Sequence, residues 1–223
     1  MSVIRVDRRR NRVITTGLIG SDYNYGDQST NPSTISVPDI PGGGSSDILI
    51  AFIASGDAQL TAPSPWTDLG YDSTPGTAGQ FQYTNMPVYL RAYWRPYVAG
   101  PYSFTAPGTT YNAFVRVAAF SISPAVNAVT NKGTVNSDTW AYDTTLPSYS
   151  NSSTGWYLAV FAHGRAERDV TTPPSGFTLI GTPHDAVKVN LSAYYQAISS
   201  STPSASITWS HPGVRVAMGI MIE

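Results

Sequence analysis

The residues of this chain that could carry acid–base or metal chemistry are few and widely spaced. Its three histidines are His163, His184 and His211. His163 ends an apolar run beside the sequence GRAERD, where an imidazole and carboxylates could converge on a metal or a substrate. His184 and His211 lack the close pairing of histidines that a metal site usually shows. We interpret the charges near His163 as an ordinary solvated loop, and we expect no metal and no cofactor.

No nucleophile lies in a recognisable catalytic motif either. The chain has no cysteine, which excludes disulfides, zinc–thiolate sites and thiol nucleophiles, and it has no G-x-S-x-G sequence. The glycines at 42–44 precede an apolar run instead of opening a helix, so they do not predict a phosphate loop. The sequence DYNYGD at 22–27 resembles the start of a calcium loop but lacks the acid at its last position. We therefore predict that the protein is not an enzyme; a hydrolase whose distant carboxylates meet in a cleft stays open as an alternative.

Two groups of residues have the types that bind partners. Five of the eleven arginines lie within residues 5–12, and we expect them to bind an acidic protein surface rather than nucleic acid, because no aromatic run or helix accompanies them. These are Arg5, Arg8, Arg9, Arg10 and Arg12. The second group alternates tyrosine with arginine, as protein interfaces often do, although mutual stacking on a solvent face explains it equally well. Its members are Tyr89, Arg91, Tyr93 and Arg95.

The elements that position these residues are expected to be β-strands. Charged residues make up only 12% of the chain, and two lysines and two glutamates are too few to cover long exposed helices. Short apolar runs alternate with Gly, Pro, Asn and Ser from residue 34 onward, a pattern typical of a β-sandwich. ILIAFIA and WYLAVFA are apolar on both faces, which predicts central strands covered on both sides. In VYLRAYWR the Tyr–Arg residues alternate with an apolar face, made of Val88, Leu90, Ala92 and Trp94.

An internal repeat organises the chain. ILIAFIASG (48–56) matches WYLAVFAHG (156–164), PSPWTDLG (63–70) matches PSGFTLIG (174–181), and VYLRAYWR (88–95) matches VNLSAYYQ (189–196). A Pro-Gly turn then precedes VRVA at both 115–118 and 214–217. The predicted fold is an all-β, jelly-roll or Greek-key-like β-sandwich built from two repeats, with an extended N-terminal arm. We expect the arm at 1–33, the first repeat at 34–122, a connecting segment at 123–144 and the second repeat at 145–223, with both repeats in one domain.

The first repeat resembles a β-sandwich module of tailed-bacteriophage virion proteins and some bacterial surface proteins. The likeness rests on an acid before an apolar strand, a Pro-rich turn to an aromatic and Thr, an aromatic–Arg strand end, an Ala-Gly-x-Tyr-x-Phe-Thr turn, and a closing strand. These are Asp47-ILIAF, Pro63-SPW-Thr67, Tyr93-Trp94-Arg95, Ala99-GPYSF-Thr105 and Val115-RVAAF. The second repeat departs from the pattern, with Gly155 in place of the acid and Tyr195-Gln196 in place of the aromatic–Arg pair. The resemblance covers residues 34–223 and implies a structural role in a virion.

We therefore expect a non-enzymatic bacteriophage virion protein, a capsid decoration or cement protein or a tail accessory, anchored by its arginine-rich arm. Its partners would be capsid or tail subunits, with copies of the chain forming a homo-oligomer in the assembly. The sequence shows neither the apolar run of a signal peptide nor the roughly 18 apolar residues of a membrane span, so we expect assembly in the host cytoplasm without membrane contact. The alternative is a carbohydrate-binding or host-adhesion module of a tail protein that uses loop aromatics, namely Tyr83, Tyr111, Trp140 and Tyr142.

Overall fold

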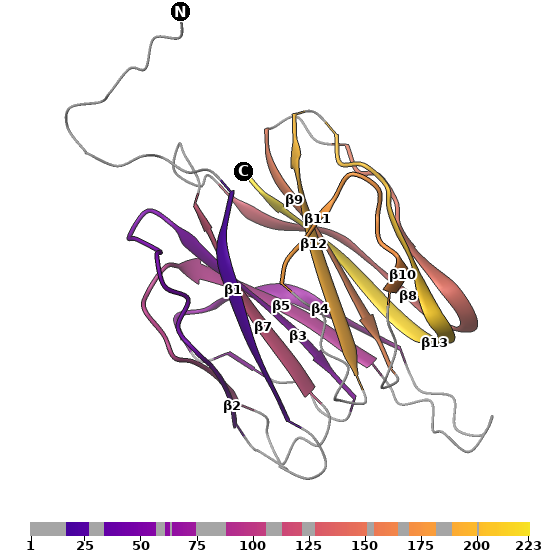
Figure 1. The fold of residues 1–223 in the computed structure, drawn as a ribbon, viewed down its shortest axis with the longest axis horizontal. Coiled ribbons are helices and arrows are strands. Elements are labelled where there is room, and N and C mark those ends of the chain that lie inside the picture. The colour runs from indigo at the N-terminus through magenta and orange to yellow at the C-terminus, as the bar shows by residue number, and fades with distance from the viewer. Residues whose placement is uncertain are drawn as a thin grey trace, which may run out of the picture.

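The computed structural model describes residues 17–26, 34–56, 61–62, 64–74, 88–105, 113–121, 128–150, 154–164, 170–181, 189–199 and 201–223. All regular elements within these ranges are β-strands, so the prediction of an all-β fold is confirmed. The strands are β1 (Gly17–Gly26), β2 (Thr34–Val37), β3 (Ile48–Ser55), β4 (Thr67–Thr74), β5 (Val88–Pro96), β6 (Tyr102–Thr105), β7 (Ala113–Ser121), β8 (Val129–Leu146), β9 (Gly155–His163), β10 (Val170–Thr172), β11 (Thr178–Leu179), β12 (Asn190–Ile198) and β13 (Ala205–Ile222). Figure 1 shows the strands of the first half, in indigo to magenta, gathered beside those of the second half, in orange to yellow.

The two halves of the chain form antiparallel sheets with the same order of strands. The first sheet has the order β1-β7-β3-β5-β4, and the second has β8-β13-β9-β12-β11, with β10 also pairing with β13. Each half thus places its first strand at an edge, beside its last strand. Phe52 pairs with Ala92 in the first sheet, and the matching Val160 pairs with Ala193 in the second. The blocks at β3 and β9, β4 and β11, and β5 and β12 therefore occupy corresponding strands.

The fourth matched block, VRVA, does not occupy equivalent positions. Arg116 pairs with Phe52 of β3, but the residue that pairs with the matching Val160 of β9 is Met218 and not Arg215. The alternation of buried neighbours places Arg116 between the two sheets and Arg215 on the opposite face of its own sheet. The identical letters are therefore offset by three residues from the structural match.

The two sheets pack face to face and share one apolar core. This central core takes residues from both halves of the chain, among them Ile50 and Phe52 of β3 and Leu158 and Val160 of β9. Complete burial of one such side chain contributes roughly 1.5 to 3 kcal/mol. The two repeats are thus held to each other by their largest buried faces.

A short ribbon covers the outer face of each sheet. In the first half β2 pairs with β6, and in the second half the end of β8 (143–146) pairs with the start of β13 (205–208). Leu49 and Ile53 of β3 face the first ribbon, and Tyr157 and Phe161 of β9 face the second. The prediction that these central strands are covered on both sides is therefore confirmed, since the other repeat covers one face and a ribbon covers the other.

Two segments that were predicted to lie outside the sheets contain edge strands. Residues 17–26, expected in the arm, form β1 and pair with β7, and residues 129–144, expected in the connecting segment, belong to β8 and pair with β13. Both strands lie at sheet edges, where polar side chains can face solvent, and their Asn, Asp and Gly residues are also typical of turns. The part of DYNYGD within the described residues, 22–26, is likewise strand and not a calcium loop. The rest of the arm, 1–16 and 27–33, lies outside the described residues.

The edges of the two sheets meet at two places, the seams between β4 and β8 and between the end of β11 and β1, and a glycine lies at each. Gly70 and Gly181, the last residues of the second matched block, have φ values of +102° and +70°. A Cβ on Gly70 would lie 3.3 Å from Nδ2 of Asn131 in β8. A Cβ on Gly181 would lie 2.6 Å from Oγ of Ser21 in β1 and would clash with the guanidinium of Arg116. Each glycine therefore meets the first strand of the other repeat, and the absence of a side chain permits this approach.

Candidate interaction surface

The alternating tyrosines and arginines of β5 lie on the outer face of the first sheet, as their period of two predicts. The β2–β6 ribbon covers part of this face, where Tyr93 is only 4% exposed. Tyr89, Arg91 and Arg95 are half-buried. Opposite Arg91 on the edge strand β4, Tyr71 is 55% exposed. The predicted face thus divides into a part that supports the core and a part that solvent and partners can reach.

Arg91 lies at the centre of the accessible part and is held from three sides. We define the Tyr–Arg surface as Asp68, Tyr71 and Arg91, with the buried Tyr93 ring packed against the Arg91 guanidinium. The Arg91 guanidinium forms an ion pair with Asp68, with Nε 3.4 Å from Oδ1, and lies 5.7 Å from the Tyr71 ring centroid and 5.1 Å from that of Tyr93. These contacts restrict a long side chain to one orientation, which lowers the entropy cost of binding a partner.

The charges of the Tyr–Arg surface persist at neutral pH. The hydrogen bond to Asp68 raises the pKa of Arg91. Burial alone would raise the pKa of Asp68, but hydrogen bonds from Arg91 and the Gly70 amide outweigh burial and hold that pKa below its usual value. Burial raises the pKa of Tyr93, so its phenol stays protonated. The surface therefore presents an ion pair whose two charges offset each other and, at Tyr71, an exposed phenol ring. This combination is suited to a polar protein interface.

The second repeat does not present the same surface. Ser192 and Leu179 take the positions of Arg91 and Asp68, as the pairing of their strands shows. Ser192 is fully buried under the second ribbon. The ion pair and the exposed ring are therefore specific to the first repeat, as expected of a contact that the fold itself does not require.

Most other residues predicted to bind partners lie outside the described part of the chain. Tyr142 is the exception, since it lies on β8 and is 52% exposed. The backbone of residue 140 is also part of β8, but its side chain is outside the description. The residues outside are Arg5, Arg8, Arg9, Arg10, Arg12, Tyr83 and Tyr111, together with the side chain of Trp140.

Several residues on which the resemblance to virion proteins rests form hydrogen bonds that stabilise turns. Asp39 accepts hydrogen bonds from the Gly100 amide at 2.6 Å and from the Tyr102 hydroxyl at 3.0 Å, and the first of these is the main cause that lowers the pKa of Asp39. Asp47, the acid before the apolar strand, accepts a hydrogen bond from the Gly44 amide at 2.6 Å. The motif thus encodes the connections around β3 and β6.

The departure of the second repeat from this motif has a structural cause. Gly155 stands where the first repeat has Asp47, and any side chain on Gly155 would clash with the backbone carbonyl oxygen of Ile222 in β13. The close approach of β13 therefore excludes an acid at this position.

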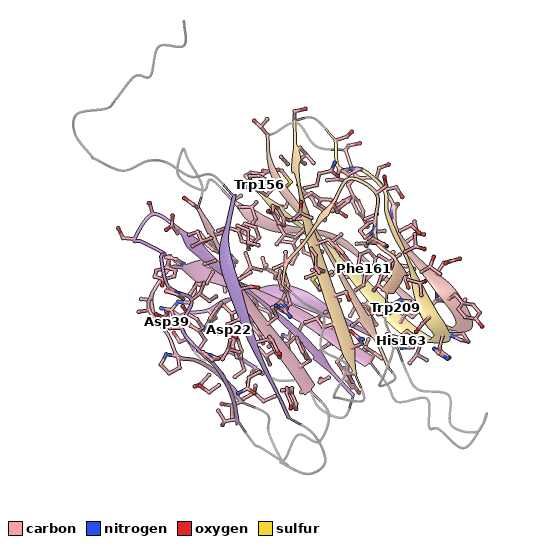
Figure 2. All side chains as sticks on the ribbon, viewed as in Figure 1. Asp22, Asp39, Trp156, Phe161, His163 and Trp209 are labelled. Atoms are coloured by element: carbon pink, nitrogen blue, oxygen red, sulfur yellow. The ribbon has the colours of Figure 1, made fainter. Side chains whose placement is uncertain are left out.

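A row of buried polar side chains that the sequence pattern did not predict crosses the second sheet. Asn190, His163 and Arg215 lie side by side on β12, β9 and β13, and each is at most 3% exposed. The His163 ring lies 5.0 Å from that of Trp209, and Figure 2 shows both at the end of the second sheet away from Trp156. Burial lowers the pKa of Arg215. His163 is therefore enclosed beneath the outer layer, whereas the neighbouring charges that we interpreted as a solvated loop, at 165–169, lie outside the described residues.

The titratable side chains among the described residues are not arranged for acid–base or metal chemistry. They contain no group of three or more His, Cys, Asp or Glu that could hold a metal ion. Asp39 and Asp68, the carboxyl groups with a shifted pKa in this part of the chain, are both shifted downward, whereas a general acid needs an upward shift. His211 is exposed and lies 3.1 Å from the Ser210 hydroxyl. His184 is outside the description.

Comparison of the chain with protein-family models, with curated proteins and with solved structures finds no match. The described residues include no helix long and apolar enough to cross a membrane.

Proposed function

We propose that this chain is a non-enzymatic structural protein of a bacteriophage particle, which decorates or cements the capsid and is anchored by the arginines ahead of β1. The observation that carries the proposal is the position of those arginines. The first strand begins at Gly17, and residues 5–12, with five of the chain's eleven arginines, precede it directly. A cationic segment next to a low-charge sandwich is suited to anchoring on an acidic protein surface.

The Tyr–Arg surface supports the same proposal as a second contact. Tyrosine and arginine are enriched among the residues that dominate interface energetics, and here a pre-formed cluster of them occurs in one repeat only. Neighbouring copies of the chain or capsid subunits are the partners we assign to it. Assembly in the host cytoplasm and a place in the virion belong to this proposal.

Deletion of residues 2–16 is expected to abolish attachment and to leave a folded sandwich. The deletion must end at residue 16, because Gly17 starts β1 and its removal would disturb the first sheet. Binding is measured by co-sedimentation with phage particles depleted of this chain, and folding by circular dichroism and urea unfolding. We expect at least a roughly tenfold loss of affinity that is mimicked by high salt, because the contact is ionic.

A matched pair of full-length variants separates charge from sequence. Replacing the five arginines of residues 5–12 by lysine keeps the charge, and replacing them by glutamine removes it. Binding that persists in the glutamine variant contradicts the anchor. Equal binding of the wild type to duplex DNA and to the particles contradicts an acidic protein partner.

A carbohydrate-binding module is the second candidate, and the exposure of Tyr142 and Tyr71 favours it. Exposed aromatic rings with nearby polar groups can stack on sugar rings and bond to their hydroxyls. If this function holds, the wild type binds sugars on a glycan array, and Tyr142→Ala or Tyr71→Ala lowers that binding by about tenfold or more. An array without signal for the wild type removes this candidate and leaves the structural role unaffected.

A further inference from the structure

Strand β1 is the edge strand of the first sheet, and among the described strands it pairs with β7 alone. An edge strand presents a row of backbone N–H and C=O groups that can pair with a strand of another molecule. In an antiparallel sheet, the N–H groups of residues two apart point to the same side of the strand. The Tyr23 and Tyr25 amides, two residues apart, therefore point to the same side of β1.

Both amides are bonded to the side chain of the preceding residue. Tyr23 N donates to Oδ1 of Asp22 at 2.7 Å, and Tyr25 N donates to Oδ1 of Asn24 at 2.8 Å. Asn24 also donates from Nδ2 to the Ser36 carbonyl oxygen at 2.7 Å, which fixes the orientation of its amide and ties the edge to β2. Figure 2 labels Asp22 on this strand. These side chains thus bond backbone donors of the strand that lies at the edge of the sheet.

The same device recurs on two other edge strands, β4 and β8. In each case an Asp or Asn side-chain oxygen accepts a hydrogen bond of 2.8 Å from a nearby backbone amide. The pairs are Asp68 with Gly70, Asp72 with Ser73, and Asn131 with Gly133. At the seam between β4 and β8, Asn131 also donates to the Leu69 carbonyl oxygen at 3.0 Å. On β1, β4 and β8, side chains thus form hydrogen bonds with the backbone of the edge strand itself.

The composition of the chain explains why such a device is needed. Natural edge strands are commonly protected by lysine, proline or other charges. This chain has two lysines in all, and β1, with the sequence GLIGSDYNYG, contains neither lysine nor proline. Asp and Asn bonded to the backbone supply the protection that lysine and proline supply elsewhere.

We propose that the two tyrosine amides face the open side of β1, so that Asp22 and Asn24 guard this edge against strand addition by a second copy of this chain. Copies and partners then contact the sandwich through its faces and loops, and the sheets do not continue from one molecule to the next. The same two residues would keep a protein that is concentrated on a particle surface from aggregating.

The test is the variant Asp22→Ala with Asn24→Ala in the full chain. We expect it to remain folded and to self-associate, with an association constant about tenfold or more above that of the wild type, because two backbone donors become available to a second strand. Sedimentation velocity over a range of concentrations measures association, and circular dichroism with urea unfolding measures folding. A variant that is folded and as monomeric as the wild type overturns the proposal.

Two control variants exclude simpler causes. Asp22→Asn removes the charge and keeps the accepting Oδ1, so it should associate no more than the wild type. If it associates like the double variant, the charge and not the backbone hydrogen bond is responsible. Leu158→Ala weakens the central core and leaves both edge residues in place. If it self-associates as much as the double variant, partial unfolding explains the association and the proposal fails.

Discussion

Gly181→Ala is expected to lower the free energy of unfolding by about 3 kcal/mol, against about 1 kcal/mol for Gly70→Ala. Both residues have positive φ, where an L residue is strained. Only at Gly181 would the new methyl group also clash, since it would meet the buried Arg116 guanidinium and lie 2.6 Å from Ser21 Oγ. At Gly70 the nearest atom, Nδ2 of Asn131, would be 3.3 Å away and could shift by the small distance required.

Urea unfolding of the two variants beside the wild type measures this difference. The two glycines occupy the same position of the second matched block, both have positive φ, and each lies where one repeat approaches the other. Each variant is therefore the control for the other. Equal losses in the two variants would show that backbone strain alone matters, and that the close approach of Arg116 to the second repeat has no energetic consequence.

Arg116→Met is expected to raise the free energy of unfolding, by about 1 to 2 kcal/mol. Arg116 is 2% exposed, and its guanidinium packs 5.1 Å from the Tyr23 ring and 5.6 Å from the Phe114 ring and bonds to Ser21 Oγ at 3.2 Å. The residue at the corresponding register of the second sheet is Met218, so the fold accommodates a methionine at this depth. A buried cation replaced by an apolar side chain of similar length no longer has to be taken out of water.

The pH dependence of this gain identifies its cause. Burial lowers the pKa of Arg116 to about 10, so above that pH the unfolded state binds more protons than the folded state. The penalty of burying the cation is fully present below a pH of about 10 and declines as the pH rises further. The advantage of Arg116→Met over the wild type should therefore shrink at alkaline pH. Comparing the two proteins cancels the titration of the tyrosines that they share.

A double-mutant cycle joins the two predictions. Beyond its own stabilising effect, Arg116→Met should recover part of the loss caused by Gly181→Ala, because it removes the guanidinium that the new methyl group would meet. In Gly70→Ala it should add its own effect and recover nothing further. A destabilised Arg116→Met protein would show that the polar contacts of the arginine outweigh its burial. Equal recovery in both glycine variants would contradict a local clash.

The apolar strands and their facing were predictable because alternation is a local property. VYLRAYWR places Val88, Leu90 and Ala92 in the central core, as its period of two requires. WYLAVFAH contained a further signal that was not used. His163 follows Tyr157, Ala159 and Phe161 at steps of two, on a face that the doubly apolar strand required to be covered. A buried histidine could have been predicted from that position.

The edge strands were not predictable in the same way. SDYNYGD looks like a turn-rich arm because Asp, Asn and Gly favour turns, and its pairing partner, β7, lies about ninety residues away along the chain. The side chains that resemble loop ligands, Asp22 and Asn24, instead bond their own strand. A polar sequence does not distinguish an exposed edge strand from a loop, because both face solvent. They differ only in that an edge strand pairs with a neighbouring strand.

The sequence by itself determined that the chain is all-β, that its central strands are covered on both sides, and that its two halves contain matched blocks. These conclusions follow from period-two alternation and from matched blocks, which need no knowledge of distant contacts. Only the tertiary structure decided that VRVA is offset by three residues, that the supposed arm and connecting segment contain edge strands, and that one arginine of the repeated tetrapeptide lies between the sheets while the other lies under a ribbon. The physical reason is that the face a side chain takes depends on which residue of a distant strand it pairs with, and a shift of an odd number of residues reverses that face.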